Sequence, residues 1–212
     1  MIIWEGNSQL DGTPIVAIMT GFKKSSKNSK TGKMPQIWII RADIHPVEAM
    51  RNGQDSSICG ACPHRPKVLG EKALSKKSRS CYVNAMPIGN VYRTYARGGY
   101  NKVSLEEMSN NLAGRHVRLG AYGDPAAVPI EVWEQLLKNC ESTGYTHQWK
   151  DCDKSYAKYC MASCDTPLDV VKATRMGYRT FFVQNVKQVA NTLKQVDDIK
   201  FAWCPEIGRA HV

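Results

Sequence analysis

Two apolar runs near the N-terminus have the length and composition of β-strands. Residues 15–19 (Ile-Val-Ala-Ile-Met) and 36–40 (Gln-Ile-Trp-Ile-Ile) are rich in β-branched side chains, which favour extended backbone. Between them, residues 22–33 are polar, contain turn-forming residues and carry five lysines. The pattern predicts a β-hairpin over residues 15–41 that carries a basic loop.

Apolar runs and helical periodicity alternate through the second half of the chain. Residues 104–114 and 130–140 repeat apolar side chains at helical spacing, and Thr166-Pro167 is a helix-start signal. Strand-like runs occupy residues 117–121, 145–149, 159–163, 179–183 and 199–203. Because strands joined by helix-length crossovers run parallel, residues 115–204 predict βα repeats. We therefore expect an α/β fold, a partial (βα) TIM-like barrel of about six parallel strands with an N-terminal β-hairpin and an irregular Cys-containing insertion.

The insertion, residues 51–84, is rich in Gly, Pro, Lys and Ser and contains three of the cysteines. Cys59 and Cys62 form a CxxC chelating pair, and Cys81 is available as a third ligand. With His64 as the fourth ligand, the set would close a zinc site. Three thiolates alone would hold a [4Fe–4S] cluster with one open iron. The spacing leaves both metals open, and the alternative is that the thiols hold no metal.

Length and composition indicate one domain without a membrane anchor. A chain of 212 residues suffices for one hydrophobic core, and we expect a single domain over residues 1–206. No apolar run reaches the ~18 residues of a membrane span, and the first residues lack a signal-peptide pattern. We expect a cytoplasmic protein of a bacterial host, in which the eight cysteines stay reduced. Residues 207–212 resemble translated sequencing adapter, which predicts a non-native tail on a metagenomic fragment.

The formal net charge of +10 is concentrated in two segments. Residues 23–41 carry six basic and no acidic side chains, and residues 65–79 carry six basic side chains against Glu71. Such patches attract phosphate groups, so we expect a nucleic acid or a phosphorylated substrate as partner. The alternative is a solubilising surface. The candidate phosphate contacts are Lys23, Lys24, Lys27, Lys30, Lys33 and Arg79.

Several polar residues follow the predicted parallel strands, where ligands bind in α/β proteins. Asp124 comes after the strand at 117–121, and His147 lies in the next one. Ser163 and Asp165 end the following strand. We expect Asp124 and His147 as catalytic groups and Asp124, Ser163 and Asp165 as cofactor contacts. The alternatives are ordinary Gly-Asp-Pro turn chemistry for Asp124 and, for His147, a role as a ligand or as a packed core histidine.

The whole chain resembles a family of uncharacterised bacteriophage proteins. The shared motifs are Thr20-Gly-Phe-Lys, Trp38-Ile-Ile-Arg-Ala-Asp43, Cys59-Gly-Ala-Cys62-Pro-His-Arg, Cys81-Tyr-Val-Asn84, Arg118-Leu-Gly-Ala-Tyr-Gly-Asp-Pro125, Thr143-Gly-Tyr-Thr-His-Gln-Trp149 and Tyr159-Cys-Met-Ala-Ser163. The resemblance implies a further cysteine-rich tail beyond Cys204-Pro205. It implies no particular activity.

The order of motifs is also similar to that of radical S-adenosylmethionine enzymes, which have a partial βα barrel. Those enzymes carry three cysteines after the first strand, a Gly-Glu-Pro-like turn and a Ser-x-Asp-like turn. Here Gly123-Asp124-Pro125 and Ser163-Cys-Asp165 stand at comparable places, whereas the usual CxxxCxxC spacing is replaced by Cys59-x2-Cys62-x18-Cys81.

The second resemblance implies a [4Fe–4S] cluster on Cys59, Cys62 and Cys81, with Asp124 contacting S-adenosylmethionine. The chain would then be an enzyme that acts on a nucleic acid or a nucleotide. The alternative is a non-catalytic zinc-binding protein that interacts with nucleic acid in phage replication or host takeover. In that case His64 completes the zinc site.

Overall fold

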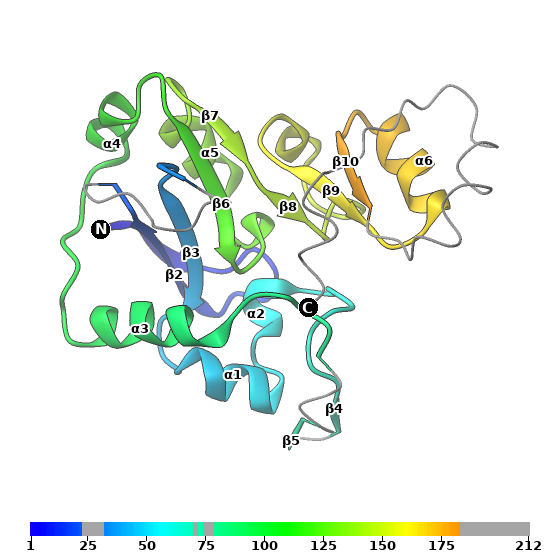
Figure 1. Ribbon diagram of the computed structural model, residues 1–212, viewed down its shortest axis with the longest axis horizontal. Coiled ribbons are helices and arrows are strands. Elements are labelled where there is room, and N and C mark those ends of the chain that lie inside the picture. The colour runs from blue at the N-terminus through cyan, green and yellow to red at the C-terminus, as the bar shows by residue number, and fades with distance from the viewer. Residues whose placement is uncertain (23–31, 70–71, 74–78, 183–212) are drawn as a thin grey trace.

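The computed structural model describes residues 1–22, 32–69, 72–73 and 79–182 (Figure 1). Its helices are α1 (Pro46–Asn52), α2 (Ser56–Cys59), α3 (Ala85–Ala96), α4 (Leu105–Asn111), α5 (Ile130–Leu136) and α6 (Pro167–Arg175), with 3-10 turns η2 (Pro125–Ala127) and η3 (Lys154–Lys158). Its strands are β1 (Ile2–Asn7), β2 (Pro14–Thr20), β3 (Gln36–Arg41), β4 (Val68–Leu69), β5 (Lys72–Ala73), β6 (His116–Tyr122), β7 (Glu141–Thr143), β8 (Tyr145–Thr146), β9 (Met161–Cys164) and β10 (Thr180–Phe182). No helix within these residues has the length and apolar character needed to cross a membrane.

The strands form two main sheets. The larger has the order β1-β2-β3-β6-β7, in which β1, β2 and β3 pair antiparallel and β3, β6 and β7 pair parallel. The smaller has the order β10-β9-β8 and is parallel throughout. The antiparallel pairing of β2 with β3, from Ile15 opposite Arg41 to Thr20 opposite Gln36, confirms the predicted hairpin pairing. The basic loop from residue 23 to 31 lies outside the described residues.

The predicted partial TIM-like barrel of about six parallel strands is wrong. Half of the pairings in the larger sheet are antiparallel, and three parallel strands form a separate sheet. The chain leaves one sheet for the other at Gly144, since β7 pairs with β6 whereas β8 pairs with β9. A Cβ at Gly144 would lie 3.0 Å from Leu119 Cβ, so this crossing is a close backbone approach. Two predicted elements, 186–193 and 199–203, lie outside the described residues.

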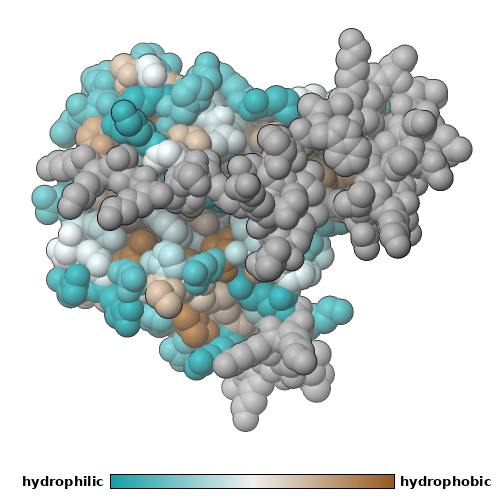
Figure 2. All heavy atoms as spheres, in the orientation of Figure 1, coloured by the Kyte–Doolittle hydropathy of each residue, from teal (hydrophilic) through white to brown (hydrophobic). Residues whose placement is uncertain are grey.

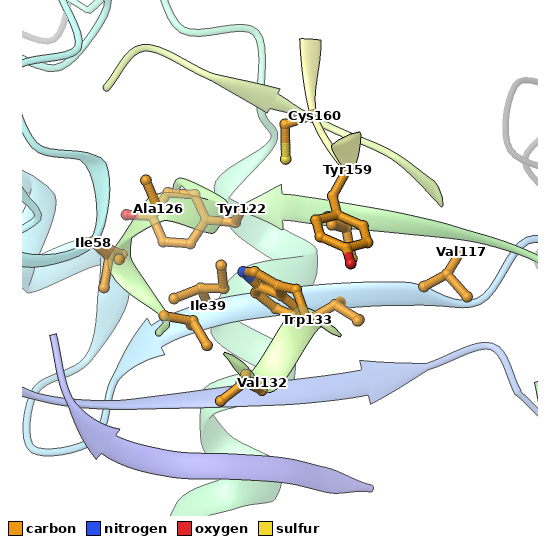
Figure 3. Close-up of a cluster of buried hydrophobic side chains, with 14 of the residues drawn as sticks. Ile39, Ile58, Val117, Tyr122, Ala126, Val132, Trp133, Tyr159 and Cys160 are labelled. Atoms are coloured by element: carbon orange, nitrogen blue, oxygen red, sulfur yellow. The ribbon is translucent and has the colours of Figure 1, made fainter. Parts of the chain in front are cut away.

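The core lies between the larger sheet and its helices. Ile15 to Met19 of β2 are buried on both faces, as expected for a central strand. Helices α1 and α3 pack on each other and on β3, and α4 packs on α5 and β1. In Figure 3, Trp133 of α5 lies beside Ile39 of β3, and the Trp133 indole donates to the Pro125 carbonyl at 2.9 Å. Figure 2 shows hydrophilic residues over most of the described surface on this face.

Helix ends follow the sequence signals. Ser104 Oγ accepts from Glu107 N at 3.1 Å, and Thr166 Oγ1 accepts from Asp169 N at 3.1 Å, so both predicted N-caps are confirmed. Asn84 caps α3 in the same way by accepting from Met86 N at 3.0 Å. Helix α6 packs on β9 and β10 and so covers the smaller sheet.

Candidate metal centre

Four chain segments meet beyond the carboxyl ends of β3, β6, β8 and β9. Asp124, just after β6, donates its backbone N–H to the Ile58 carbonyl of α2 at 2.6 Å. Its carboxylate Oδ2 accepts from the backbone N–H of His147, just after β8, at 2.8 Å. Asp165 follows β9 directly and reaches the same place. In α/β proteins this end of the strands is where ligands bind.

Arg65 and Asp55 hold the cysteine loop closed. The Arg65 guanidinium donates to Asp55 Oδ1 from Nε at 3.0 Å and from Nη2 at 2.7 Å, and it also donates to the Gly60 carbonyl at 3.0 Å. The Asp55 side chain is only 3% exposed, so this charge pair is largely removed from water. The turn between Cys59 and Cys62 is closed by a backbone hydrogen bond of 3.2 Å.

Gly60 allows Gln148 to lie under this loop. Gly60 has φ +54°, and a Cβ there would overlap the side-chain amide of Gln148. Gln148 is buried, donates from Nε2 to the Cys59 carbonyl at 3.1 Å and accepts from Ala61 N at 3.4 Å. The loop therefore needs glycine at this position for conformation and for space.

Asp124 is a buried connector between the loop and β8. Its Oδ1 accepts a hydrogen bond from Ala126 N at 3.0 Å, so Asp124 caps the N-terminus of η2. Its Oδ2 accepts a hydrogen bond from His147 N. Burial raises the pKa of the Asp124 carboxyl, and the N–H donors of Ala126 and His147 act in the opposite direction. Both oxygens are engaged by backbone, so the arrangement fits the turn interpretation and also fixes the position of His147.

His64, His147 and Asp165 converge on one point. Their ligand atoms all lie within 4.8 Å of one another. His64 Nε2 is 3.2 Å from Asp165 Oδ1, and His147 Nε2 is 4.0 Å from the same oxygen. In a tetrahedral zinc site, bond lengths of ~2.0–2.2 Å place such ligand atoms ~3.3–3.5 Å apart. The His64–Asp165 distance is close to this spacing, and the His147–Asp165 distance is longer, so His147 would have to move toward a bound ion.

The two imidazoles have different surroundings. His64 Nδ1 lies 2.8 Å from Ser80 Oγ, and a hydrogen bond there leaves Nε2 to face Asp165. Burial lowers the pKa of His147, the Asp165 charge raises it, and the His64 charge lowers it further. A lowered pKa favours the neutral imidazole, which is the form that binds metal.

Of the three cysteines of the insertion, Cys62 and Cys81 contact this group, and no group of metal-binding side chains found among the described residues includes a cysteine. Cys62 Sγ is 4.0 Å from His147 Nε2. Cys81 donates its backbone N–H to the His64 carbonyl at 3.0 Å, which brings it onto the loop. Burial raises the pKa of Cys62 to about 11 and that of Cys59 well above its ordinary value, and the charges of neighbouring thiolates add to both shifts. Such thiols stay protonated at neutral pH unless a cation stabilises the thiolate.

The predicted cofactor contact Ser163 and the candidate phosphate contacts are not part of the His64, His147 and Asp165 group. Ser163 lies in β9, and its backbone carbonyl accepts from the Trp149 indole at 3.1 Å. Arg79 Nη2 donates to the Val83 carbonyl at 2.7 Å, and Lys33 lies just before β3. The other candidate phosphate contacts lie outside the described residues: Lys23, Lys24, Lys27 and Lys30.

A cavity of about 590 Å³ lies beside the cysteine loop, and His64, His147 and Asp165 are not among the residues that line it. Gly60, Ala61 and Gln148 form part of its wall, so it shares these residues with the cysteine loop. Glu131, together with two aspartates of the segment that follows Gln148, lines another part. Its volume is in the range of small-molecule sites.

Comparisons with models of protein families, with curated protein sequences and with solved structures found no match to this chain. The resemblances to a bacteriophage family and to radical S-adenosylmethionine enzymes therefore stay predictions.

Proposed function

We propose that this protein binds a divalent transition metal, zinc by the chemistry of its ligands, through His64, His147 and Asp165. The observation that carries the proposal is the convergence of three ligand atoms within 4.8 Å from segments far apart in sequence. Imidazole and carboxylate with a thiol beside them form a ligand set that zinc accepts in tetrahedral geometry.

Three protein ligands leave a fourth coordination position for a ligand from solvent, which is typical of catalytic zinc sites. The side chains of His64 and Asp165 are 42% and 41% exposed, so solvent reaches the centre. Bound zinc would act as a Lewis acid on the oxygen of a ligand or would lower the pKa of a bound water. The net charge of +10 supports an anionic ligand, a phosphate ester or nucleic acid.

Metal analysis of the purified full chain tests this function. Zinc is expected at one equivalent per chain or more, and His147→Ala is expected to lower the zinc affinity of the centre by at least ~100-fold. His116→Ala is the matched control, because His116 is exposed and pairs only with Glu141 at 3.3 Å among the contacts found for it. Equal zinc affinity in His147→Ala and wild type would contradict the proposal.

A second candidate function is an iron–sulfur enzyme of the radical S-adenosylmethionine type. The observation in its favour is that backbone hydrogen bonds tie the three cysteines to one loop, from Cys62 N to the Cys59 carbonyl at 3.2 Å and from Cys81 N to the His64 carbonyl at 3.0 Å. Anaerobic purification separates the candidates. A brown protein with iron and sulfide would favour the enzyme, and a colourless protein with zinc would contradict it.

A further inference from the structure

His64 lies between a hydroxyl and a carboxylate. Its Nδ1 is 2.8 Å from Ser80 Oγ, and its Nε2 is 3.2 Å from Asp165 Oδ1. A serine, an imidazole and a carboxylate in contact are the parts of a nucleophile, its base and the group that orients the base. The two ring nitrogens are exchanged relative to serine proteases, but such a set is recognised by geometry and roles.

The carboxylate decides in which direction the two hydrogen bonds run. An ionised carboxylate only accepts, so its contact with the neutral His64 ring places the ring proton on Nε2. The other nitrogen, Nδ1, is then an acceptor, and Ser80 donates its O–H to it. In this arrangement His64 can take the Ser80 proton while the oxygen attacks a substrate.

Backbone contacts bring the three residues together from three segments. Cys81 N donates to the His64 carbonyl at 3.0 Å, which ties the segment of Ser80 to the loop of His64. Asp165 stands between β9 and α6, directly before the Thr166 N-cap. Ser80 is exposed, and the other two side chains are partly exposed, so a small substrate can reach the serine oxygen.

His116 shows what distinguishes this arrangement from an ordinary surface pair. His116 Nδ1 lies 3.3 Å from Glu141 Oε2, but the contacts found for His116 include no hydroxyl. Among the histidines that the structure describes, His64 alone has both a hydroxyl and a carboxylate at its ring nitrogens.

We propose that Ser80 is a nucleophile that takes an acyl group from a carboxylic ester, with His64 as its base and Asp165 orienting the base. Ser80 Oγ bonds to the carbonyl carbon as its proton passes to His64 Nδ1. The ester C–O bond then breaks, and the leaving alcohol takes that proton from His64. The products are an acyl ester of Ser80 and a free alcohol. This activity goes beyond the proposed function, because it belongs to the chain without metal.

Zinc and this reaction compete for His64. With zinc on Nε2, the neutral ring carries its proton on Nδ1, which then donates to Ser80 instead of accepting from it. The imidazole has no free nitrogen left to take the Ser80 proton. Bound zinc is therefore expected to suppress the reactivity of Ser80.

A fluorophosphonate probe tests the proposal on the full chain stripped of metal. Ser80 Oγ bonds to phosphorus, and fluoride leaves with the serine proton as hydrogen fluoride. Peptide mass spectrometry then measures the labelling rate of each serine. Ser80 is expected to react at least ~100-fold faster than exposed Ser155 of the same chain, and faster by the same factor than Ser80 in urea.

Variants assign the roles. His64→Ala is expected to remove the rate advantage of Ser80, and Asp165→Asn is expected to reduce it. Ser80→Ala is expected to leave no label at residue 80. His116→Ala is the matched control and is expected to be labelled like wild type.

Equal labelling rates of Ser80 and Ser155 in the folded wild type would overturn the proposal, whether or not the variants fold. A fast Ser80 that is unaffected in folded His64→Ala would also overturn it. Slow labelling of Ser80 in a chain that binds zinc through His147 would leave the proposed function standing alone. Fast labelling that bound zinc does not slow would support the nucleophile and contradict His64 as a zinc ligand.

Discussion

Gly60 sets how closely the cysteine loop approaches the rest of the centre. It adopts φ +54°, and Gln148 occupies the space in which a Cβ would lie. Gln148 in turn donates to the Cys59 carbonyl at 3.1 Å. The identity of residue 60 therefore controls the position of Cys59 and Cys62 through packing, in addition to backbone conformation.

Gly60→Ala is expected to destabilise the protein by ~2–4 kcal/mol, because it adds a steric overlap to an unfavourable φ. Gly12→Ala is the matched control. Gly12 also has a positive φ, +75°, but no atom lies within 4 Å of a Cβ built there, so a loss of only ~1 kcal/mol is expected. Chemical denaturation of both variants measures the difference. Equal losses of stability in the two variants would show that the Gln148 side chain moves aside at no measurable free-energy cost.

The residues of the candidate metal centre were predicted from the sequence as site residues, but their grouping was not. His64 was predicted to join the three thiols in a zinc site, whereas its Nε2 lies 3.2 Å from Asp165 Oδ1. Asp165 was predicted to contact a cofactor and His147 to be a catalytic group, and both lie in the same group as His64. The sequence signals were the residue types and their places after strands. Their meeting depends on how separate segments pack, which local spacing does not encode.

At the scale of elements, the centre is carried by segments with little regular structure. Helix α2 has four residues, and β8 has two. The loop around α2 depends on side-chain bonds such as the pair of Arg65 with Asp55, and on backbone bonds such as Asp124 N to the Ile58 carbonyl at 2.6 Å. Segments with few ladder hydrogen bonds open locally at low cost, so a bound metal contributes strongly to their order.

Metal removal is therefore expected to loosen residues 53–65 and 146–148 and to leave β2 unchanged. After chelation, amide hydrogen exchange in the two segments is expected to rise about tenfold or more, equivalent to ~1.4 kcal/mol of local stability. Strand β2 serves as the internal control because Ile15 to Met19 are buried in the core. Unchanged exchange in residues 53–65 would mean that the metal does not order the loop.

At the scale of the molecule, the sequence predicted local pairing better than architecture. The antiparallel partners β2 and β3 were predicted from two apolar runs and a turn-rich connection. The barrel was predicted from alternating strand and helix patterns, which indicate crossovers but carry no information on whether a sheet closes. Gly144 sits where the chain passes from one sheet to the other, and a lone glycine in a strand pattern does not distinguish a crossing from a bulge.

The central claim is that His64, His147 and Asp165 form a metal centre. X-ray absorption at the zinc edge of the full chain tests it most directly, because the spectrum reports the atoms bonded to the ion. Nitrogen and oxygen neighbours are expected at ~2.0–2.2 Å, with imidazole scattering that decreases in His147→Ala. A first shell of sulfur alone, unchanged in His147→Ala, would contradict the account.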